Sequence, residues 1–186
     1  MKSPRTNLRL LQPQDFTPEG VAALQTLFNR SIMHGGTIGF LKPMTRRAAQ
    51  EYFQSLRAGI DGADVIAVVA GSRPLDGFGL IRRDPSELRR HCWEMGRVTV
   101  RQEMQRHGLG AAIVRRLVAE AKRRKVEILW LDVRITNVAA IELFQKLDFR
   151  TWGIFPGCIK DRRNYVDVLY MALDLRSSYR PLRDLP

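Results

Sequence analysis

The sequence predicts a single α/β domain built around a mixed β-sheet with helices on both of its faces. Apolar, strand-like runs alternate with amphipathic, helix-like runs in the order β-α-α-β-β-β-α-β-α-β-β. The middle of this order is a β-α-β unit, which favours parallel pairing, and the hairpins on either side favour antiparallel pairing. A chain of 186 residues is long enough to bury a sizeable core and fits one domain, residues 1–186.

The N-terminal half is expected to contain three strands and two helices. Val21, Leu24 and Leu27 recur at helical spacing in the first helix. Thr45 is the expected N-cap of the second helix, and Gly59 is its expected end. The predicted elements are a strand over 8–11, a helix from Pro18 to a glycine-rich loop over 34–43, a helix from 45 to about 57, and strands over 65–70 and 78–81.

The C-terminal half is expected to contain the β-α-β unit and a closing hairpin. The helix over 111–124 carries Ile113 and Leu117 on one face. The run over 128–133 is nearly all apolar, which predicts a strand covered on both faces. The remaining predicted elements are a strand over 93–100, a helix over 138–147, strands over 150–155 and 165–173, and a loosely ordered tail after about 175.

Composition and charge narrow the class of protein. The formal net charge is +12, and a basic balance favours polyanions such as nucleic acid, a membrane surface or a phosphorylated cofactor. We find no apolar run long enough to span a bilayer and no pattern typical of a secretory signal. Two cysteines, Cys92 and Cys158, do not make a disulfide framework, and no His or Cys spacing predicts a metal site. These features predict a cytoplasmic protein.

One heptapeptide between a predicted strand and a predicted helix indicates phosphate binding. Its residues are Gln105, Arg106, His107, Gly108, Leu109, Gly110 and Ala111. The two glycines allow a sharp turn and leave amide N–H groups unshielded, and the helix that follows adds its own unpaired N–H groups and the positive end of its dipole. A dinucleotide-binding pattern would need a third glycine where Ile113 stands, and no Lys-Ser or Lys-Thr pair completes a Walker-type loop.

These residues resemble the cofactor signature of the GNAT superfamily of N-acetyltransferases. The signature stands here as Gln105-x-x-Gly108-x-Gly110, after a strand that ends Val98-Thr99-Val100 and before a crossover that reads Asn137-Val138-Ala139-Ala140-Ile141. The resemblance covers roughly residues 8–175. It implies a sheet whose two central parallel strands splay apart, with acetyl-CoA as co-substrate.

The resemblance also implies which residues hold acetyl-CoA. The amides from Arg106 to Ala111 would bind its pyrophosphate. Its pantetheine arm would pair with the strand that ends at Val98, Thr99 and Val100, where one amide would polarise the thioester carbonyl. Gly96 would supply a bulge that splays this strand, or is an ordinary strand irregularity. Asn137 would cap a helix and also reach the cofactor.

The catalytic residues are less clearly indicated. Many relatives use a Tyr as general acid, but Phe144 stands at that position and Asp148 replaces the usual Gly that follows. Phe144 would then line the cofactor near its sulfur, and Tyr165 and Tyr170 are candidate substitutes for the acid. Glu94 is the first candidate for the general base, unless it only pairs with an arginine such as Arg97. Asp132, in an apolar strand, is the rival base and should be paired or have a raised pKa.

The resemblance leaves the acceptor open. The loop over 34–40 would form one wall of the acceptor site, and its sequence is similar to the phosphinothricin-type branch, which acetylates small amino-acid-like amines. The strand over 129–134 is instead similar to acetylases of ribosomal-protein N-termini. We favour a small primary amine, with the protein N-terminus as the alternative. A non-catalytic, basic, nucleic-acid-associated module is the third reading, although nucleic acid is not the expected partner. A second copy of the chain is a further candidate partner.

Overall fold

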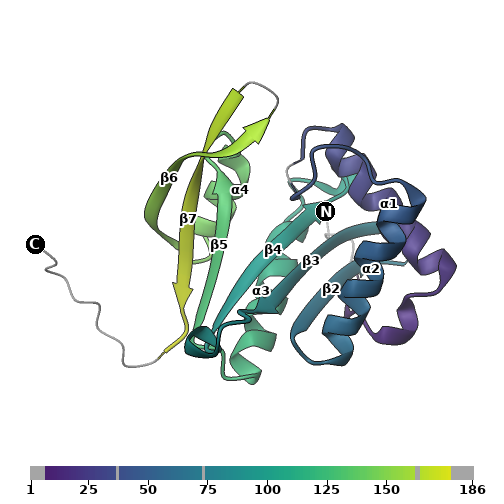
Figure 1. The fold of residues 1–186 in the computed structure, drawn as a ribbon, viewed down its shortest axis with the longest axis horizontal. Helices are drawn as coiled ribbons and strands as arrows, with labels where there is room; N and C mark the ends of the chain where they lie inside the picture. The colour runs from purple at the N-terminus through teal and green to yellow at the C-terminus, as the bar shows by residue number, and fades with distance from the viewer. Residues whose placement is uncertain (1–6, 37, 73, 162–163, 177–186) are drawn as a thin grey trace, which may run out of the picture.

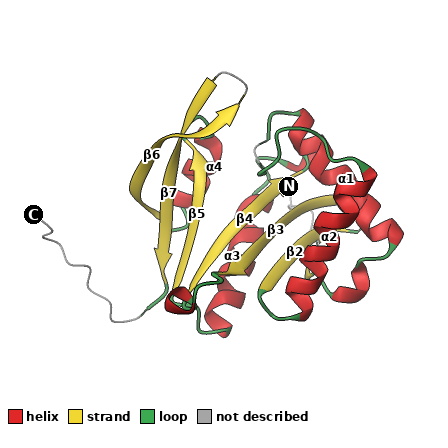
Figure 2. Cartoon of the chain, in the orientation of Figure 1, coloured by secondary structure: helices red, strands yellow, loops and turns green. Residues whose placement is uncertain are grey.

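The computed structural model describes residues 7–36, 38–72, 74–161 and 164–176. The predicted order of strands and helices is confirmed, with short 3₁₀ turns added between some of them. The elements are β1 (Leu8–Leu10), α1 (Pro18–Met33), α2 (Arg46–Asp61), β2 (Val65–Gly71), β3 (Leu75–Arg83), β4 (Cys92–Val100), α3 (Leu109–Arg123), β5 (Ile128–Arg134), α4 (Val138–Gln145), β6 (Arg150–Asp161) and β7 (Asn164–Asp174). Figure 2 shows them coloured by type.

The strands form one mixed sheet with helices on both faces, as predicted. The strand order is β1-β2-β3-β4-β5-β7-β6, and only the β4–β5 pair is parallel among the pairs that the structure describes. One core lies between the sheet and α3 and α4, and is built around Ile113, Leu117 and Leu131. A second core lies between the other face and α1 and α2, and is built around Phe28 and Phe53. Two cores are needed because each face of the sheet must bury its apolar side chains.

The two central strands pair at one end and separate at the other. β4 and β5 are in register only from Cys92 opposite Ile128 to Glu94 opposite Trp130. Beyond that point β4 stays paired with β3, whereas β5 stays paired with β7. Figure 1 shows the resulting V-shaped opening between β4 and β5. The sheet is therefore splayed, and the edge of β4 that faces β5 beyond Glu94 has no strand partner.

β5 differs from the predicted strand that is covered on both faces. Its burial alternates: Leu129, Leu131 and Val133 are buried against α3 and α4, but Asp132 is exposed and Arg134 is only half-buried. Because β5 splays away from β4, the helices that cover β2 and β3 do not cover this face of β5 (Figure 1). The expectation that Asp132 sits amid apolar neighbours is therefore wrong.

Several predicted boundaries also shift. α2 continues through Gly59 and ends at Asp61. Gly59 is a packing residue rather than a helix end, because a Cβ at this position would lie only 2.6 Å from Val65 Cγ2 on β2. α3 begins at Leu109 rather than at 111, since Gly108, with φ of 79°, serves as its N-cap. β3, β6 and β7 are longer than predicted, because antiparallel pairing extends them beyond their apolar centres. Most of the tail predicted after 175 lies outside the described residues.

Candidate active site

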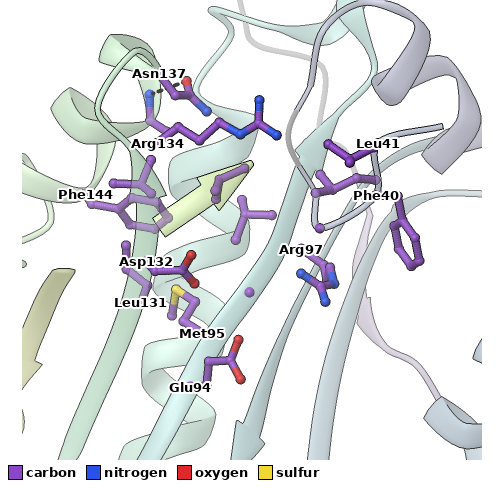
Figure 3. Close-up of a pocket in the computed structure, with 17 residues that line it drawn as sticks. Phe40, Leu41, Glu94, Met95, Arg97, Leu131, Asp132, Arg134, Asn137 and Phe144 are labelled. Atoms are coloured by element: carbon purple, nitrogen blue, oxygen red, sulfur yellow. Dashed lines mark hydrogen bonds between the residues drawn. The ribbon is translucent and has the colours of Figure 1, made fainter. Parts of the chain in front are cut away.

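A cavity of about 270 Å³ lies where β4 and β5 separate (Figure 3). β4 contributes residues 94–98 and β5 contributes residues 131–134. The loop between α1 and α2 closes one side with residues 38–41, and Asn137 and Phe144 close the other. The loop over 34–40, which was predicted to form one wall of the acceptor site, thus lines the cavity with residues 38–40. The cavity brings together side chains that are far apart in the sequence.

Both candidate bases line this cavity. Glu94 is the last residue of β4 to pair with β5, and its Oε1 lies 3.5 Å from the position of a Cβ on Gly96. Its carboxylate therefore lies along the strand toward the opening. Trp130 is opposite Glu94, so Asp132, two residues further along β5, has its side chain on the same face. Neither carboxylate has a hydrogen bond or ion pair with any residue that the structure describes.

A bulge in β4 bends the strand at the cavity. The β3–β4 register shifts between the pair Phe78–Thr99 and the pair Leu80–Gly96, so that two residues of β4 face one residue of β3. The expected bulge is present, but Gly96 does not carry its unusual conformation. Arg97 does, with φ of 57°. A non-glycine residue in the left-handed region is uncommon and gives no signal in the sequence.

Two arginines in the cavity were missed by the sequence reasoning. The guanidinium of Arg97 lies against the backbone of Gly39, with its Cζ 5.6 Å from the ring centroid of Phe40. Arg134 follows Asp132 by two residues on β5, and its Nε is buried without a hydrogen-bond partner among the described residues. The two-residue spacing after Asp132 could have indicated Arg134, because alternate residues of a strand share a face.

The predicted phosphate loop is an exposed turn at the start of α3. Arg106 and Gly108 both have positive φ, 62° and 79°. No side chain caps the helix, and a Cβ at Gly108 would have nothing within 4 Å. The amides of Leu109, Gly110 and Ala111 belong to the first turn, where a helix offers no carbonyl to accept from them. The loop therefore presents unpaired N–H groups at the positive end of a helix dipole.

Side chains within this loop hold its shape. Gln105 Nε2 donates to the Val100 carbonyl over 3.1 Å, and His107 Nδ1 lies 2.7 Å from the Gln105 carbonyl. The side chain of Leu109 is buried in the core. A Cβ at Gly110 would lie 3.4 Å from Leu143 Cδ2, so this glycine brings α3 close to α4. These contacts define the shape of the loop.

Other predicted cofactor residues divide into two groups. Val98, Asn137 and Phe144 line the cavity, and Asn137 also caps α4 by accepting a hydrogen bond of 3.3 Å from the Ala140 amide. Thr99 points away from it, since its buried hydroxyl donates to Ser31 Oγ over 2.9 Å. Thr99 can therefore contact a ligand in the opening only through its backbone.

The protein-family comparison adds to this geometry. Residues 24–149 match the model of the Acetyltransferase (GNAT) family, which is more than half of the chain. The chain belongs to the GNAT family. The central strands β2 to β5 and the glycine loop at the start of α3 lie within the matched region, whereas β1, β6 and β7 lie outside it.

Curated relatives resemble part of the chain. It is 38% identical over 85 residues to the [ribosomal protein bS18]-alanine N-acetyltransferase of Escherichia coli (strain K12). That match covers 42% of this chain and 53% of the relative, so the chain spans about half the length of the curated relatives it matches.

Solved GNAT structures share the fold over almost the whole chain. The structure of yncA from Salmonella typhimurium, solved with its cofactor acetyl-CoA, has a TM-score of 0.79 at 19% identity and covers 96% of this chain and 98% of its own. A GNAT phosphinothricin acetyltransferase from Sinorhizobium meliloti, in complex with acetyl-CoA, has a TM-score of 0.75 at 17% identity. The match covers 92% of this chain and 89% of that chain. At these identities the likeness shows the GNAT fold alone.

Of the two departures from the GNAT motif, the one at Asp148 has a structural explanation. Asp148, where the family has Gly, adopts φ of 66° just after α4, a conformation that Asp tolerates better than most side chains. The Phe149 amide closes this helix end by donating to the Phe144 carbonyl over 3.1 Å. Phe144 is buried in the cavity wall, with its ring 5.4 Å from that of Phe149.

The tyrosine candidates do not reach the cavity wall. Tyr165 is 66% exposed near the β6–β7 turn, with Lys160 Nζ 5.5 Å from its ring, and it is not among the residues that line the cavity, so its catalytic role stays a prediction. Tyr170 lies opposite Asp132, and its ring is 6.2 Å from that of Trp130. Burial first, and then Cys158 and Asp132, raise the pKa of Tyr170.

Neither a metal centre nor a membrane span is found in residues 7–36, 38–72, 74–161 and 164–176. Within them, no cluster of three or more His, Cys, Asp or Glu side chains could hold a metal ion. No helix in that part of the chain is both long and apolar enough to cross a bilayer.

Proposed function

We propose that the protein is an acetyl-CoA-dependent N-acetyltransferase, and that its acceptor is the primary amine of a small amino-acid-like molecule. The observation that carries this proposal is the cavity at the β4–β5 opening, which combines an unpaired strand edge with two carboxylates that have no described partner. Family membership supports the enzymatic reading over a nucleic-acid-associated module.

The residues present fit acetyl-CoA. The uncapped first turn of α3, with its exposed Gly108, suits a pyrophosphate. The edge of β4 between Met95 and Thr99 has backbone groups available to an extended arm. Bound acetyl-CoA supplies an acyl group activated as a thioester. A β4 amide at the opening would stabilise negative charge on the thioester oxygen.

Glu94 is the general base in this proposal. The attacking amine must be neutral, and a carboxylate at the point where the two strands diverge can take its proton directly or through one water. Glu94 lies where β4 and β5 diverge, beside the strand edge that would hold the thioester. Asp132 is the second candidate. It lies on β5, two residues after Trp130, the residue that pairs with Glu94.

No side-chain acid is assigned to the leaving thiolate. Phe144 occupies the position of the family's Tyr and carries no proton to donate. A CoA thiolate is a good leaving group, so protonation by solvent suffices. Burial raises the pKa of Tyr170, but this side chain is not part of the cavity wall.

A protein N-terminus is the second candidate acceptor. The support is the name of the curated relatives, which acetylate the alanine of ribosomal protein bS18, together with the 38% identity over 85 residues. The small cavity supports the first candidate, because about 270 Å³ must also admit the acetyl end of the cofactor. The cytoplasmic location and the homodimer expected from the sequence stay predictions.

A turnover assay tests the proposed function. The protein is incubated with acetyl-CoA and, separately, with amino acids, simple amines and a peptide that begins with alanine. We expect release of free CoA thiol together with an acceptor that gains one acetyl group by mass spectrometry. Thiol release without any acetylated amine would contradict the proposal. Preferred acetylation of the peptide would select the second candidate.

A further inference from the structure

We propose that the acceptor carries an anionic group close to its amine, and that Arg97 and Arg134 bind this group. The inference rests on the proposed function, since it concerns the acceptor half of the same cavity. Neither arginine belongs to the cofactor motif or to the pair of candidate bases. Both line the cavity, one from β4 and one from β5, on opposite sides of the opening (Figure 3).

Arg134 supplies the first observation. Its Nε is shielded from solvent, yet it has no hydrogen-bond partner among the described residues. A buried guanidinium N–H without a partner is unfavourable, and a carboxylate is the partner that guanidinium groups bind best, often through two parallel hydrogen bonds. Figure 3 shows the side chain reaching from β5 toward the opening. Arg134 is therefore placed to receive an anion from the cavity.

Arg97 supplies the second observation. The β4 bulge holds its backbone in the left-handed region, at φ of 57°, which is a strained conformation for a side chain of this size. Its guanidinium fits beside Gly39 and over the ring of Phe40. The loop between α1 and α2 thus braces Arg97 at the cavity wall. Strained residues cluster at ligand-binding sites, where the surrounding structure holds them in place.

The charges of the cavity select a zwitterion. Arginines elsewhere pair with acids, for example Arg101 with Asp76 over 2.6 Å, whereas Arg97 and Arg134 form no ion pair with Glu94, Asp132 or any other described residue. Two arginines and two carboxylates that form no ion pair among the described residues thus share one cavity, and they complement a molecule with one positive and one negative group. An amine without an anionic group would face the arginines unpaired, which disfavours it.

Matched acceptors test this inference. For each of several amino acids, kcat/KM is compared among the free acid, its carboxamide and the amine that lacks the carboxyl group. We expect the acid to exceed both by about 10- to 100-fold, which is the usual effect of charged hydrogen bonds. Arg134→Gln and Arg97→Gln should reduce this preference, mainly through KM. Arg57→Gln is the control, because Arg57 is exposed on α2, away from the cavity.

Binding measurements separate this inference from the proposed function. Calorimetry with CoA present compares the same acid and carboxamide without turnover. Tighter binding of the acid that Arg134→Gln abolishes would support the inference, even if no amine were acetylated. Equal affinity or equal kcat/KM for acid and amide would overturn it. Preferred acetylation of an alanine peptide, unaffected by either arginine variant, would also overturn it.

Discussion

The guanidinium of Arg97 fills the space beside Gly39 that a side chain at residue 39 would occupy. A Cβ built on Gly39 would lie 2.1 Å from Arg97 Nη1. The loop between α1 and α2 and the bulge of β4 therefore fit together only because residue 39 has no side chain. This contact links the acceptor wall to the strand that lines the cavity.

Gly39→Ala should displace Arg97 and lower kcat/KM for the acceptor by about 10-fold, the loss expected for one charged hydrogen bond. The effect on KM for acetyl-CoA should be small. Gly35→Ala is the control, because Gly35 has nearly the same φ, 79° against 82°, but a Cβ there would meet nothing within 4 Å. Steady-state kinetics with varied acceptor concentration gives kcat/KM for both variants. An equal loss in the two variants would mean that backbone strain alone is responsible.

Gly108→Asn should weaken acetyl-CoA binding by about 10-fold or more, because the added side chain would occupy the open space at the uncapped start of α3. Asn is chosen since it tolerates positive φ. Isothermal titration with acetyl-CoA gives the affinity, and thermal unfolding shows that the variant is folded. Gly35→Asn places the same residue at a similar φ away from the loop. Unchanged affinity in a folded Gly108→Asn protein would rule out this loop as the phosphate site.

Glu94→Gln should lower kcat by about 10²–10⁴, the usual loss for a general base, and leave the affinity for acetyl-CoA nearly unchanged. The amide keeps the shape of the carboxylate but cannot accept a proton from the amine. Asp132→Asn is the matched variant, since Asp132 lines the same cavity from β5. If Asp132→Asn loses turnover and Glu94→Gln retains it, the base is Asp132.

Tyr165→Phe and Tyr170→Phe should each keep kcat within about threefold at saturating acetyl-CoA, because neither phenol lines the cavity. A missing general acid would cost at least about 10²-fold. Phe144→Tyr is the complementary variant, since it restores the hydroxyl at the family position, and we expect little gain. A collapse of turnover in Tyr170→Phe would show that Tyr170 donates the proton.

Cys158 should be alkylated by iodoacetamide about 10-fold faster than Cys92 at pH 8. Burial first, and then the carboxylate of Asp84, raise the pKa of Cys92, so less of its reactive thiolate is present at this pH. Cys158 is exposed. Peptide mass spectrometry over time gives both rates, and the difference should vanish in denaturant. Faster reaction at Cys92 in the folded protein would contradict the described burial.

The sequence was sufficient for the order of elements and for the position of the glycine loop before α3, and it pointed to two carboxylates that both line the cavity, although their role as bases stays a prediction. These features depend on local signals: the period of apolar residues, N-caps such as Thr45 and Asn137, and two glycines before an amphipathic run. They hold here because the local patterns and the packing across the sheet favour the same elements. Boundaries were less accurate, since packing decides them: α2 passes through Gly59 because Val65 lies against it.

Only the tertiary structure decided the composition of the acceptor site. Arg97 enters the cavity because β4 must bulge to stay paired with β3, and Arg134 does so because β5 turns away from β4 and leaves one face open. The same splay explains why Asp132 is exposed although its strand is apolar. Register shifts and the divergence of two strands arise from pairing across the whole sheet, so no local pattern in the sequence encodes them.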